Sequence, residues 1–561
     1  MRVVSVVSAA VDPFEASRAA AATGLLRTFN DVGVLSAADV HVASRLGALA
    51  GEDDEAVSLA VALAVRGPRL GHVFVDLATI RDTASVEADE PVDLSVLPWP
   101  PPGGWIRAVG ASGLVAVGEE DPAADRPLRL LGTRLYLDRY WREERCVAAD
   151  LNELAASDRL HVIAGGPGTG KTTRVARMVA ELIEEAVAHG ARAPLIALAA
   201  PTGKAAARLQ EVVHEERPEL DGLRASTLHR LLGWRPGSHS RFAHHRGNRL
   251  PHDVVIVDET SMVSLSMMAR LVEAVRPDAR LVLVGDPGQL TSIEAGVVLG
   301  DIVGDGTRKG IVMLERVHRY GAGIARAADA IRRGDSDDAV AGLDDAPGEV
   351  TWLRMDVQES GVGPELVRQR AVAAGLEVAA AARDGDAPRA LDALSRFRVL
   401  CAHRRGPYGV SDWTVRIQGW LAVDIEDIEL RDYVGRPLLV TENDYELGLY
   451  NGDTGVIVQG DGGHASAVFE RGRALMHFSP LRLGAVETVY AMTVHKSQGS
   501  QFDTAAVLLP SSSSRILTRE LLYTAITRAR RELILVGSED AVRGAVERPV
   551  ARASGLAERL R

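Results

Sequence analysis

The sequence predicts an α/β protein with two lobes, each built on a parallel sheet that helices cover on both sides. From residue 160 onward, helical segments alternate with four short apolar runs, RLHVIAGG, APLIALAAP, DVVIVDE and ARLVLVGD. Strands buried on both faces have this composition, and functional groups gather where such strands end. A second strand-and-helix region follows from about 325 to 540, in which alanine-rich helices precede the strand FRVLCAH.

The length of 561 residues predicts three or four domains. We predict a mainly helical N-terminal domain at 1–145, a first lobe at 146–325, a second lobe at 326–540 and a C-terminal tail at 541–561. Inside the second lobe, the run NGDTGVIVQGDGGHASAVFERGRALMHF has the glycine-rich turns of hairpins. A small β insert is therefore expected at about 440–485.

The N-terminal region shows local patterns but no chemical motif. EAVSLAVALAVRGPRLGHVFVDL predicts a buried helix, a turn and a strand, and an amphipathic helix is expected near residues 136–154. The first residues faintly resemble a signal peptide, but the apolar run stops at Asp12, so a strand or an irregular start is the preferred interpretation. The sequence contains no apolar stretch of about 20 residues, so no membrane span is predicted.

Composition restricts the class of protein. Cys146 and Cys401 lie far apart and have no partner spacing, which argues against a disulfide framework and fits a reducing cytoplasm. The net charge of −12 does not suggest nucleic-acid binding, although a large protein can hold a strand in a local channel. Only four of the 64 basic residues are lysines, Lys171, Lys204, Lys309 and Lys496, and three of these fall in the motifs below.

The segment GGPGTGKT follows a predicted strand and opens a predicted helix, which is the setting of a P-loop. Backbone N–H groups of such a loop surround phosphate oxygens at the positive end of the helix. Lys171 is expected to reach the β- and γ-phosphates of ATP, and Thr172 to ligate Mg²⁺. The predicted nucleotide-contacting residues are Gly165, Gly166, Pro167, Gly168, Thr169, Gly170, Lys171 and Thr172.

Two further strand ends carry groups suited to ATP hydrolysis. In VIVDETSM, Asp258 is expected to hold Mg²⁺ and Glu259 to orient and deprotonate the attacking water. In LVLVGDPGQL, the amide of Gln289 is expected to sense the γ-phosphate. An Asp-Glu pair alone is commonly a solvated turn, but its place at the end of a strand after a P-loop favours the catalytic interpretation.

Other motifs indicate a binding site for a nucleic-acid backbone and further residues that contact the nucleotide from the second lobe. APTGKAAARL places Thr202 and Lys204 at a strand-to-helix turn, where contact with a nucleic-acid backbone is the natural use, and STLHRLLGW adds Thr227 and His229. Two arginines of the second lobe, Arg319 in LERVHRY and Arg528 in YTAITRAR, are candidates to reach the γ-phosphate and to couple lobe closure to hydrolysis.

The ordered set GGPGTGKT, APTGKAAARL, VIVDETSM, GDPGQLTSIEAG, LERVHR, YAMTVHKSQGSQF and LLYTAITRARREL resembles motifs I, Ia, II, III, IV, V and VI of superfamily 1 helicases. TVHKSQG, with a motif III that lacks an aromatic residue, is similar to the 5′→3′ branch, superfamily 1B. GRPLLVTENDYELGLYNGDTGV and EAGVVLGD resemble the RecD family, the α subunits of RecBCD (exonuclease V).

This resemblance implies two RecA-like lobes, an SH3-like insert in the second lobe, and an N-terminal domain that docks on RecC. It implies a helicase that works with RecB and RecC on duplex DNA ends in double-strand break repair and homologous recombination. ATP would lie between the lobes and single-stranded DNA across them. In motif V it implies that Thr493 and His495 contact DNA, that Gln498 and Gly499 contact the nucleotide, and that Lys496 lies between the two.

The sequence departs from the family pattern at two positions and leaves alternatives open. No glutamine precedes Gln210, so no residue is predicted to select adenine, and Gln501 stands where relatives have glutamate. No nuclease constellation is found, which fits a family whose nuclease is RecB. A stand-alone RecD-like helicase and a partner-regulated P-loop ATPase without unwinding activity remain as alternatives. For the four histidines His239, His244, His245 and His252, a solvated or DNA-facing loop is the preferred interpretation, and a metal site is the weaker alternative.

Overall fold

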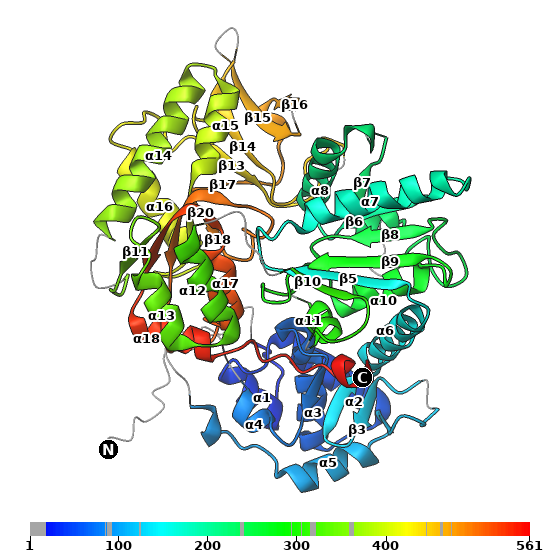
Figure 1. Ribbon diagram of the computed structural model, residues 1–561. Coiled ribbons are helices and arrows are strands. Elements are labelled where there is room, and N and C mark those ends of the chain that lie inside the picture. Colours follow the sequence, from blue (N-terminus) through cyan, green and yellow to red (C-terminus); the bar gives the residue numbers. More distant parts are fainter. Residues whose placement is uncertain are drawn as a thin grey trace, which may run out of the picture.

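The computed structural model describes residues 18–84, 86, 93–122, 125–220, 222–235, 241–292, 294–304, 306–314, 321–357, 364–444, 446–460, 464–472 and 474–560. Two parallel-sheet lobes lie side by side, a small antiparallel sheet extends one of them, and an N-terminal domain lies below both in Figure 1. The α/β prediction with two such lobes is therefore confirmed. The predicted strand or irregular start at residues 1–15 lies outside the described residues.

The first lobe is a six-stranded parallel sheet in the order β10-β5-β9-β8-β6-β7. Its strands are β5 (Leu160–Gly165), β6 (Ile196–Ala200), β7 (Ala225–Thr227), β8 (Val254–Val257), β9 (Arg280–Gly285) and β10 (Ile311–Leu314). Its helices are α6 (Asp138–Ala156), α7 (Lys171–Ala188), α8 (Gly203–Glu216), α9 (Leu228–Leu231), α10 (Leu265–Ala274) and α11 (Val298–Val303). The four apolar runs predicted as strands are β5, β6, β8 and β9, and β8 is buried at every position.

Helices cover both faces of this sheet, which explains why its central strands carry no polar face. One hydrophobic cluster joins the sheet to α6 and α10, and another joins the opposite face to α7 and α8. Burial on both faces leaves the loops at the carboxyl ends of the strands as the places for polar chemistry.

The second lobe is a five-stranded parallel sheet in the order β11-β20-β19-β12-β18. Its strands are β11 (Val350–Leu353), β12 (Phe397–Cys401), β18 (Ala491–Thr493), β19 (Phe502–Leu508) and β20 (Ala529–Val536). Its helices are α12 (Ala322–Arg333), α13 (Ser336–Asp344), α14 (Glu365–Arg383), α15 (Ala387–Arg396), α16 (Val410–Leu421), α17 (Arg519–Ile526) and α18 (Glu539–Glu547).

An antiparallel sheet is inserted between β12 and β18 in the chain. Its strands are β13 (Pro437–Val440), β14 (Thr454–Gln459), β15 (Ala465–Arg471), β16 (Ala474–Phe478) and β17 (Val486–Thr488), in the order β16-β15-β14-β13-β17. The predicted hairpins are therefore present. Its loop reaches the first lobe, because a Cβ on Gly203 at the start of α8 would lie 2.3 Å from Cγ of Tyr450.

The N-terminal domain is largely helical, as predicted, but it also contains a four-stranded sheet. Its helices are α1 (Gly24–Asp31), α2 (Ala37–Ala50), α3 (Glu55–Arg66), α4 (Ile80–Thr83) and α5 (Pro102–Ala111), and its strands are β1 (Phe74–Asp76), β2 (Val115–Val117), β3 (Leu128–Leu131) and β4 (Arg134–Leu137). The predicted helix, turn and strand are α3, a 3₁₀ turn at Gly67–Leu70 and β1. The strands of this sheet, at three or four residues each, are too short to show a periodic pattern.

The C-terminal strap, residues 548–560, runs from the second lobe back to the first lobe and the N-terminal domain (Figure 1). It ends in α19 (Leu556–Arg559), and Leu556 and Leu560 are fully buried in the cluster that contains α6. The amide of Val73 donates to the Ala553 carbonyl at 2.7 Å, so the strap pairs with the N-terminal domain. The segment predicted as a tail, 541–561, thus begins inside α18 and continues as this strap.

No helix among the described residues is long and apolar enough to cross a membrane.

Candidate nucleotide cleft and nucleic-acid groove

The P-loop connects β5 to α7 and is shaped by glycines. Gly168 and Gly170 have φ values of +79° and +81°, a region that glycine adopts without steric cost. The ammonium of Lys171 lies inside the loop, where it donates to the carbonyls of Gly165 at 2.7 Å and Gly166 at 2.8 Å. A phosphate entering the loop would replace these carbonyls as the partner of the ammonium.

The ends of β8 and α7 bring two oxygen ligands together. The Thr172 hydroxyl donates to Oδ2 of Asp258 at 3.3 Å, and Oδ1 of Asp258 accepts from the Glu259 amide at 2.8 Å. A hydroxyl and a carboxylate side by side are the donor types that Mg²⁺ prefers, so these residues fit that ion.

Glu259 is held in an unusual conformation and environment. Its φ is +51°, which costs a non-glycine residue about 1–3 kcal/mol and is found chiefly at functional sites. Burial raises the pKa of its carboxyl above the ordinary value, and the neighbouring Asp258 raises it further, while Lys171 and Arg528 oppose the shift. A pKa displaced toward neutrality suits a group that accepts a proton from water.

The segment after β9 joins the two lobes. Gln289 is buried, its amide donates to Asp286 Oδ2 at 2.9 Å, and its Oε1 accepts from Arg528 at 3.3 Å. The amide of the next residue, Leu290, donates to the Thr524 hydroxyl at 2.9 Å, and its carbonyl accepts from Gln498 at 2.6 Å. This segment therefore contacts two separate motifs of the second lobe.

Arg528 and Tyr523 form the second-lobe wall of the nucleotide cleft. Arg528 is 3% exposed and also donates to the carbonyls of Thr524 at 2.9 Å and Ser500 at 3.2 Å. Tyr523 donates to Asp286 Oδ2 at 3.1 Å, and a Cβ on Gly166 would lie 2.9 Å from its hydroxyl. The two lobes thus approach each other directly at the P-loop.

A groove of about 1670 Å³ follows the junction of the lobes from the β insert to the N-terminal domain. Among the described residues, seven cationic side chains and one acidic side chain, Glu294, line it; the cationic ones are Arg69, Lys204, Arg404, Arg405, Lys496, Arg515 and Arg552. The chain as a whole carries a net charge of −12, so this positive charge is a local feature. A deep groove lined by cations is the electrostatic footprint of a bound polyanion.

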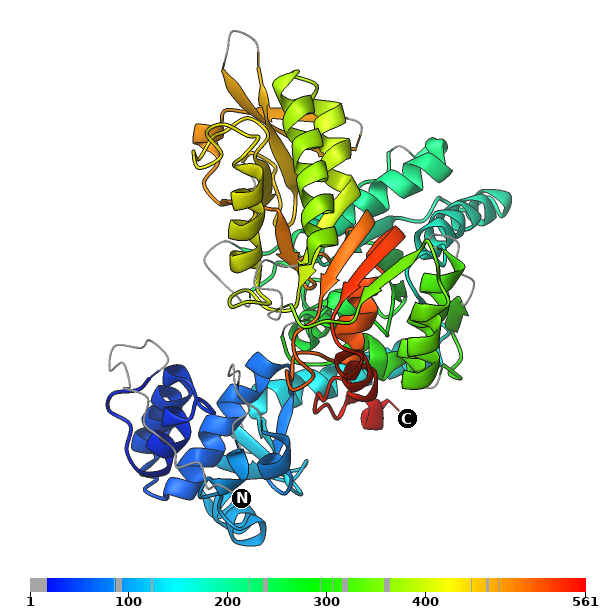
Figure 2. The same ribbon diagram turned by 90° about the vertical axis from the view of Figure 1, so that its left-hand side faces the viewer.

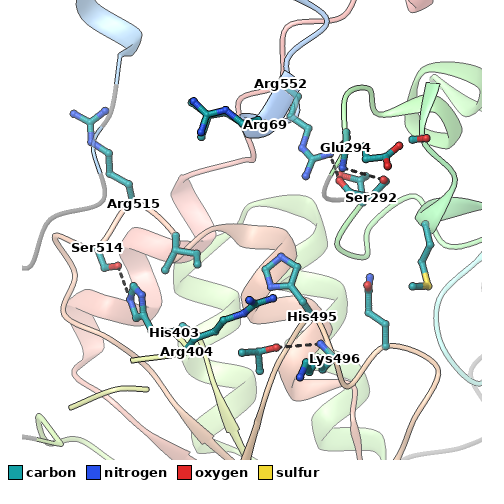
Figure 3. A pocket seen from close by; sticks show the side chains of 18 of the residues that line it. Arg69, Ser292, Glu294, His403, Arg404, His495, Lys496, Ser514, Arg515 and Arg552 are labelled. Carbon is teal, nitrogen blue, oxygen red and sulfur yellow. Dashed lines mark hydrogen bonds between the residues drawn. The ribbon is translucent and has the colours of Figure 1, made fainter. Parts of the chain in front are cut away.

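Most of the residues predicted to bind DNA line this groove. They are Thr202, Lys204, His229, Thr493 and His495. Thr227 instead caps α9, where its hydroxyl accepts from the Arg230 amide at 3.3 Å. Figure 3 shows His495 and Lys496 of motif V on the same wall as Arg404.

Lys204 crosses from the first lobe to the second. Its ammonium donates to the Ser500 hydroxyl at 2.7 Å and to the Gly452 carbonyl of the insert at 3.4 Å. Burial lowers the pKa of this lysine to about 8, and Arg398 lowers it while Asp453 opposes the shift. Its charge therefore depends on pH near neutrality.

Arg319 lies outside the described residues, so its predicted contact with the γ-phosphate stays a prediction. Gln498 lines the groove and binds Leu290, which puts its side chain against motif III. His239 also lies outside the described residues, and within them no group of three or more His, Cys, Asp or Glu is arranged to hold a metal ion.

Several groove residues were not singled out from the sequence. Arg404 and Arg405 lie in the loop that follows β12, three and four residues after its last residue, so the rule that functional groups gather at the ends of parallel strands could have found them. Arg69, Arg515 and Arg552 stand in no strand-end motif, and only the folded chain brings them to the groove.

Comparison with known proteins identifies matching family profiles and similar solved structures. Family profiles match an AAA domain at residues 148–354, a UvrD-like helicase C-terminal domain at 488–536, and the RecBCD enzyme subunit RecD, N-terminal domain, at 31–136. Solved structures of Pif1 helicase from Candida albicans and Bacteroides are 15% and 18% identical, with TM-scores of 0.39 and 0.38. The similarity to the Candida albicans structure covers 71% of this chain and 95% of that chain. The similarity to the Bacteroides structure covers 69% of this chain and 91% of that chain.

Sequence relatives are far more similar. The RecBCD enzyme subunit RecD of Mycolicibacterium smegmatis is 49% identical over 96% of this chain and 99% of its own length. The RecBCD enzyme subunit RecD of Mycobacterium tuberculosis is also 49% identical, over 96% of this chain and 97% of its own. The ATP-dependent RecD2 DNA helicase of Deinococcus radiodurans is 32% identical over 74% of this chain but only 52% of its own. This chain belongs to the RecD family, the RecD subunits of RecBCD enzymes.

Proposed function

We propose that this chain is an ATP-driven 5′→3′ single-stranded DNA translocase that unwinds duplex ends as the RecD subunit of an assembly with RecB and RecC. Its setting would be double-strand break repair and homologous recombination in the cytoplasm. Near full-length identity of 49% to two RecD subunits supports the partners, and similarity to superfamily 1B motifs supports the polarity.

One observation carries the motor function: residues 286–292 connect the nucleotide cleft to the groove. Asp286 and Gln289 contact Tyr523 and Arg528 at the cleft, whereas two residues later Thr291 lines the groove. A segment with one end at each site can convert a change of phosphate state into a displacement of the bound strand.

In the proposed reaction, Lys171 binds the β- and γ-phosphates of ATP, and Glu259 orients water and accepts its proton. Thr172 and Asp258 would hold Mg²⁺, which neutralises charge on these phosphates. Gln289 positions the same water, and Arg528 stabilises negative charge on the transferred phosphoryl group. Because Arg528 belongs to the second lobe, its contact with the nucleotide draws the lobes together.

The test of this function is ATP turnover by the purified chain with and without single-stranded DNA. We expect turnover to rise at least about tenfold with DNA, because an assembled groove completes the catalytic contacts. The same measurement is made with RecB and RecC present, so that low ATP turnover by the isolated chain is distinguished from an absence of DNA stimulation. Turnover that DNA leaves unchanged, even with both partners, would favour the partner-regulated ATPase instead.

The pKa of Lys204 gives a prediction on DNA affinity. Only the ammonium form binds a phosphate, so affinity for an oligonucleotide should be constant below pH 8 and fall by up to about tenfold per pH unit above it. Binding measured by fluorescence anisotropy at pH 7, 8 and 9 and constant ionic strength tests this. Lys204→Arg keeps its charge and should remove that part of the slope; an identical slope in the variant would contradict the assignment.

A further inference from the structure

The half of the groove nearest the N-terminal domain is lined by arginines from three separate parts of the chain. We call this set the basic rim: Arg69, Arg404, Arg405, Arg515 and Arg552. Arg69 comes from the N-terminal domain, Arg552 from the C-terminal strap, and the other three from loops of the second lobe. Figure 3 shows Arg69, Arg404, Arg515 and Arg552 around the same opening, with His495 of motif V next to them.

Contacts with the backbone hold two of these arginines at the groove. Arg515 donates to the Ala84 carbonyl of the N-terminal domain at 2.8 Å. Arg552 donates to the Ser292 carbonyl at 2.5 Å and to the Gly296 carbonyl at 3.4 Å, on the loop that follows motif III. None of these contacts neutralises the positive charge, because all three acceptors are uncharged carbonyls.

Arg404 and Arg405 are free to bind a ligand. Both side chains are exposed, and neither guanidinium makes a hydrogen bond or ion pair with another described residue. Arg404 also adds to the positive field at His495, whose pKa burial lowers first and Arg552 and Arg404 lower further. Cations gathered in this way repel one another unless an anion lies between them.

Two buried polar atoms on the same wall have no hydrogen-bond partner within the described part of the chain. They are Nε of Arg552 and Oγ1 of Thr291. Such atoms are uncommon in folded proteins, and these two belong to a wall whose polar groups the described chain does not fully satisfy. Both belong to residues that line the groove.

We propose that the basic rim is a second phosphate-binding segment, which holds the backbone of single-stranded DNA beyond the contacts made by motifs Ia and V. The inference rests on the proposed function and extends it, because the N-terminal domain and the C-terminal strap become parts of the DNA track. The rim shares one continuous groove with Thr202 and Thr493, so one strand can reach both. Guanidinium groups suit this task because their fork of N–H donors matches phosphate oxygens.

The test compares the full-length wild-type chain with Arg404→Gln/Arg405→Gln in binding a labelled oligothymidylate of about 20 nucleotides. We expect affinity to fall by roughly tenfold or more, and the slope of log K against log salt to decrease by about 0.7 for each phosphate that the variant no longer neutralises. The matched control is Arg45→Gln/Arg383→Gln, which removes the same charge from two exposed arginines outside the groove lining. It should bind as the wild type does.

A second variant tests the contribution of the N-terminal domain. Arg69 forms an ion pair with the buried Asp39, which also interacts with the buried Arg66, so Arg69→Gln alone leaves Asp39 with a countercharge. The affinity of this variant for the oligonucleotide should also be lower than that of the wild type, and its melting temperature should be unchanged.

Each outcome has a distinct meaning. If the wild-type chain binds the oligonucleotide and both rim variants have the same affinity and salt slope as the wild type, this inference alone is overturned. A wild-type chain that binds no single-stranded DNA, alone or with RecB and RecC, overturns the proposed function and this inference with it.

Discussion

An Arg528→Lys variant is expected to hydrolyse ATP about a thousandfold more slowly than the wild type while still binding it. An arginine that stabilises the phosphoryl group in the transition state contributes about 10³–10⁵ to the rate. Lysine keeps the charge but lacks the fork that contacts Gln289, Thr524 and Ser500 at once. Steady-state turnover with saturating DNA, together with the affinity for a fluorescent ATP analogue, measures both quantities.

The control for this variant is Arg530→Lys. Arg530 lies two residues further along the chain, on β20, is about half exposed, and forms an ion pair with Asp503 at 3.9 Å. Equal turnover in Arg530→Lys and wild type would exclude a general effect of the substitution. Turnover within a few-fold of wild type in Arg528→Lys would remove Arg528 from the catalytic group.

Lys171→Ala is expected to lose at least about a hundredfold in ATP turnover, the effect of removing one charged donor from a phosphate site. It should also lose the stabilisation that ATP gives the folded chain, about 2.7 kcal/mol at a hundred times the dissociation constant. The melting temperature with and without ATP reports this directly. Without ATP the variant should melt close to the wild type, because the partners of the Lys171 ammonium are carbonyls of the loop itself.

Lys309→Ala serves as the matched control, since Lys309 is an exposed lysine whose ion-pair partner is Asp158 at 2.7 Å. It should hydrolyse ATP and gain stability from ATP as the wild type does. A Lys171→Ala chain that still melts at a higher temperature with ATP would show that the nucleotide binds elsewhere.

Local sequence was sufficient to predict the elements that carry chemistry. The P-loop, the Asp258–Glu259 pair and the four central strands of the first lobe are runs of neighbouring residues whose composition depends on burial and turn geometry. The contact between Gln289 and Arg528 is different, because 239 residues separate the two and no periodicity relates them. The resemblance to a helicase family supplied the role of Arg528, and the folded chain supplied its partners.

The N-terminal domain and the strap mark the limit of prediction from sequence. Only β1 of the four strands of this domain was predicted. The strands are three or four residues long and are formed by residues on both sides of α5, so no alternating pattern identifies the other three. Leu556 and Leu560 have helical spacing, but two apolar residues in a short segment do not indicate what they pack against. Three members of the basic rim, Arg69, Arg515 and Arg552, were missed for the same reason, since they come from three distant parts of the chain.

The strap also has a consequence for how the chain is made. Leu556 and Leu560 complete a core whose other members include residues of α6 and α10, which are synthesised about 280 to 420 residues earlier. During translation, the apolar surface of the first lobe that the strap covers therefore stays exposed until the entire second lobe has been synthesised. Contacts between such distant residues form late and leave hydrophobic surface exposed in the meantime. This nascent chain is consequently a candidate client for chaperones, with the apolar site on α6 as the surface they would cover.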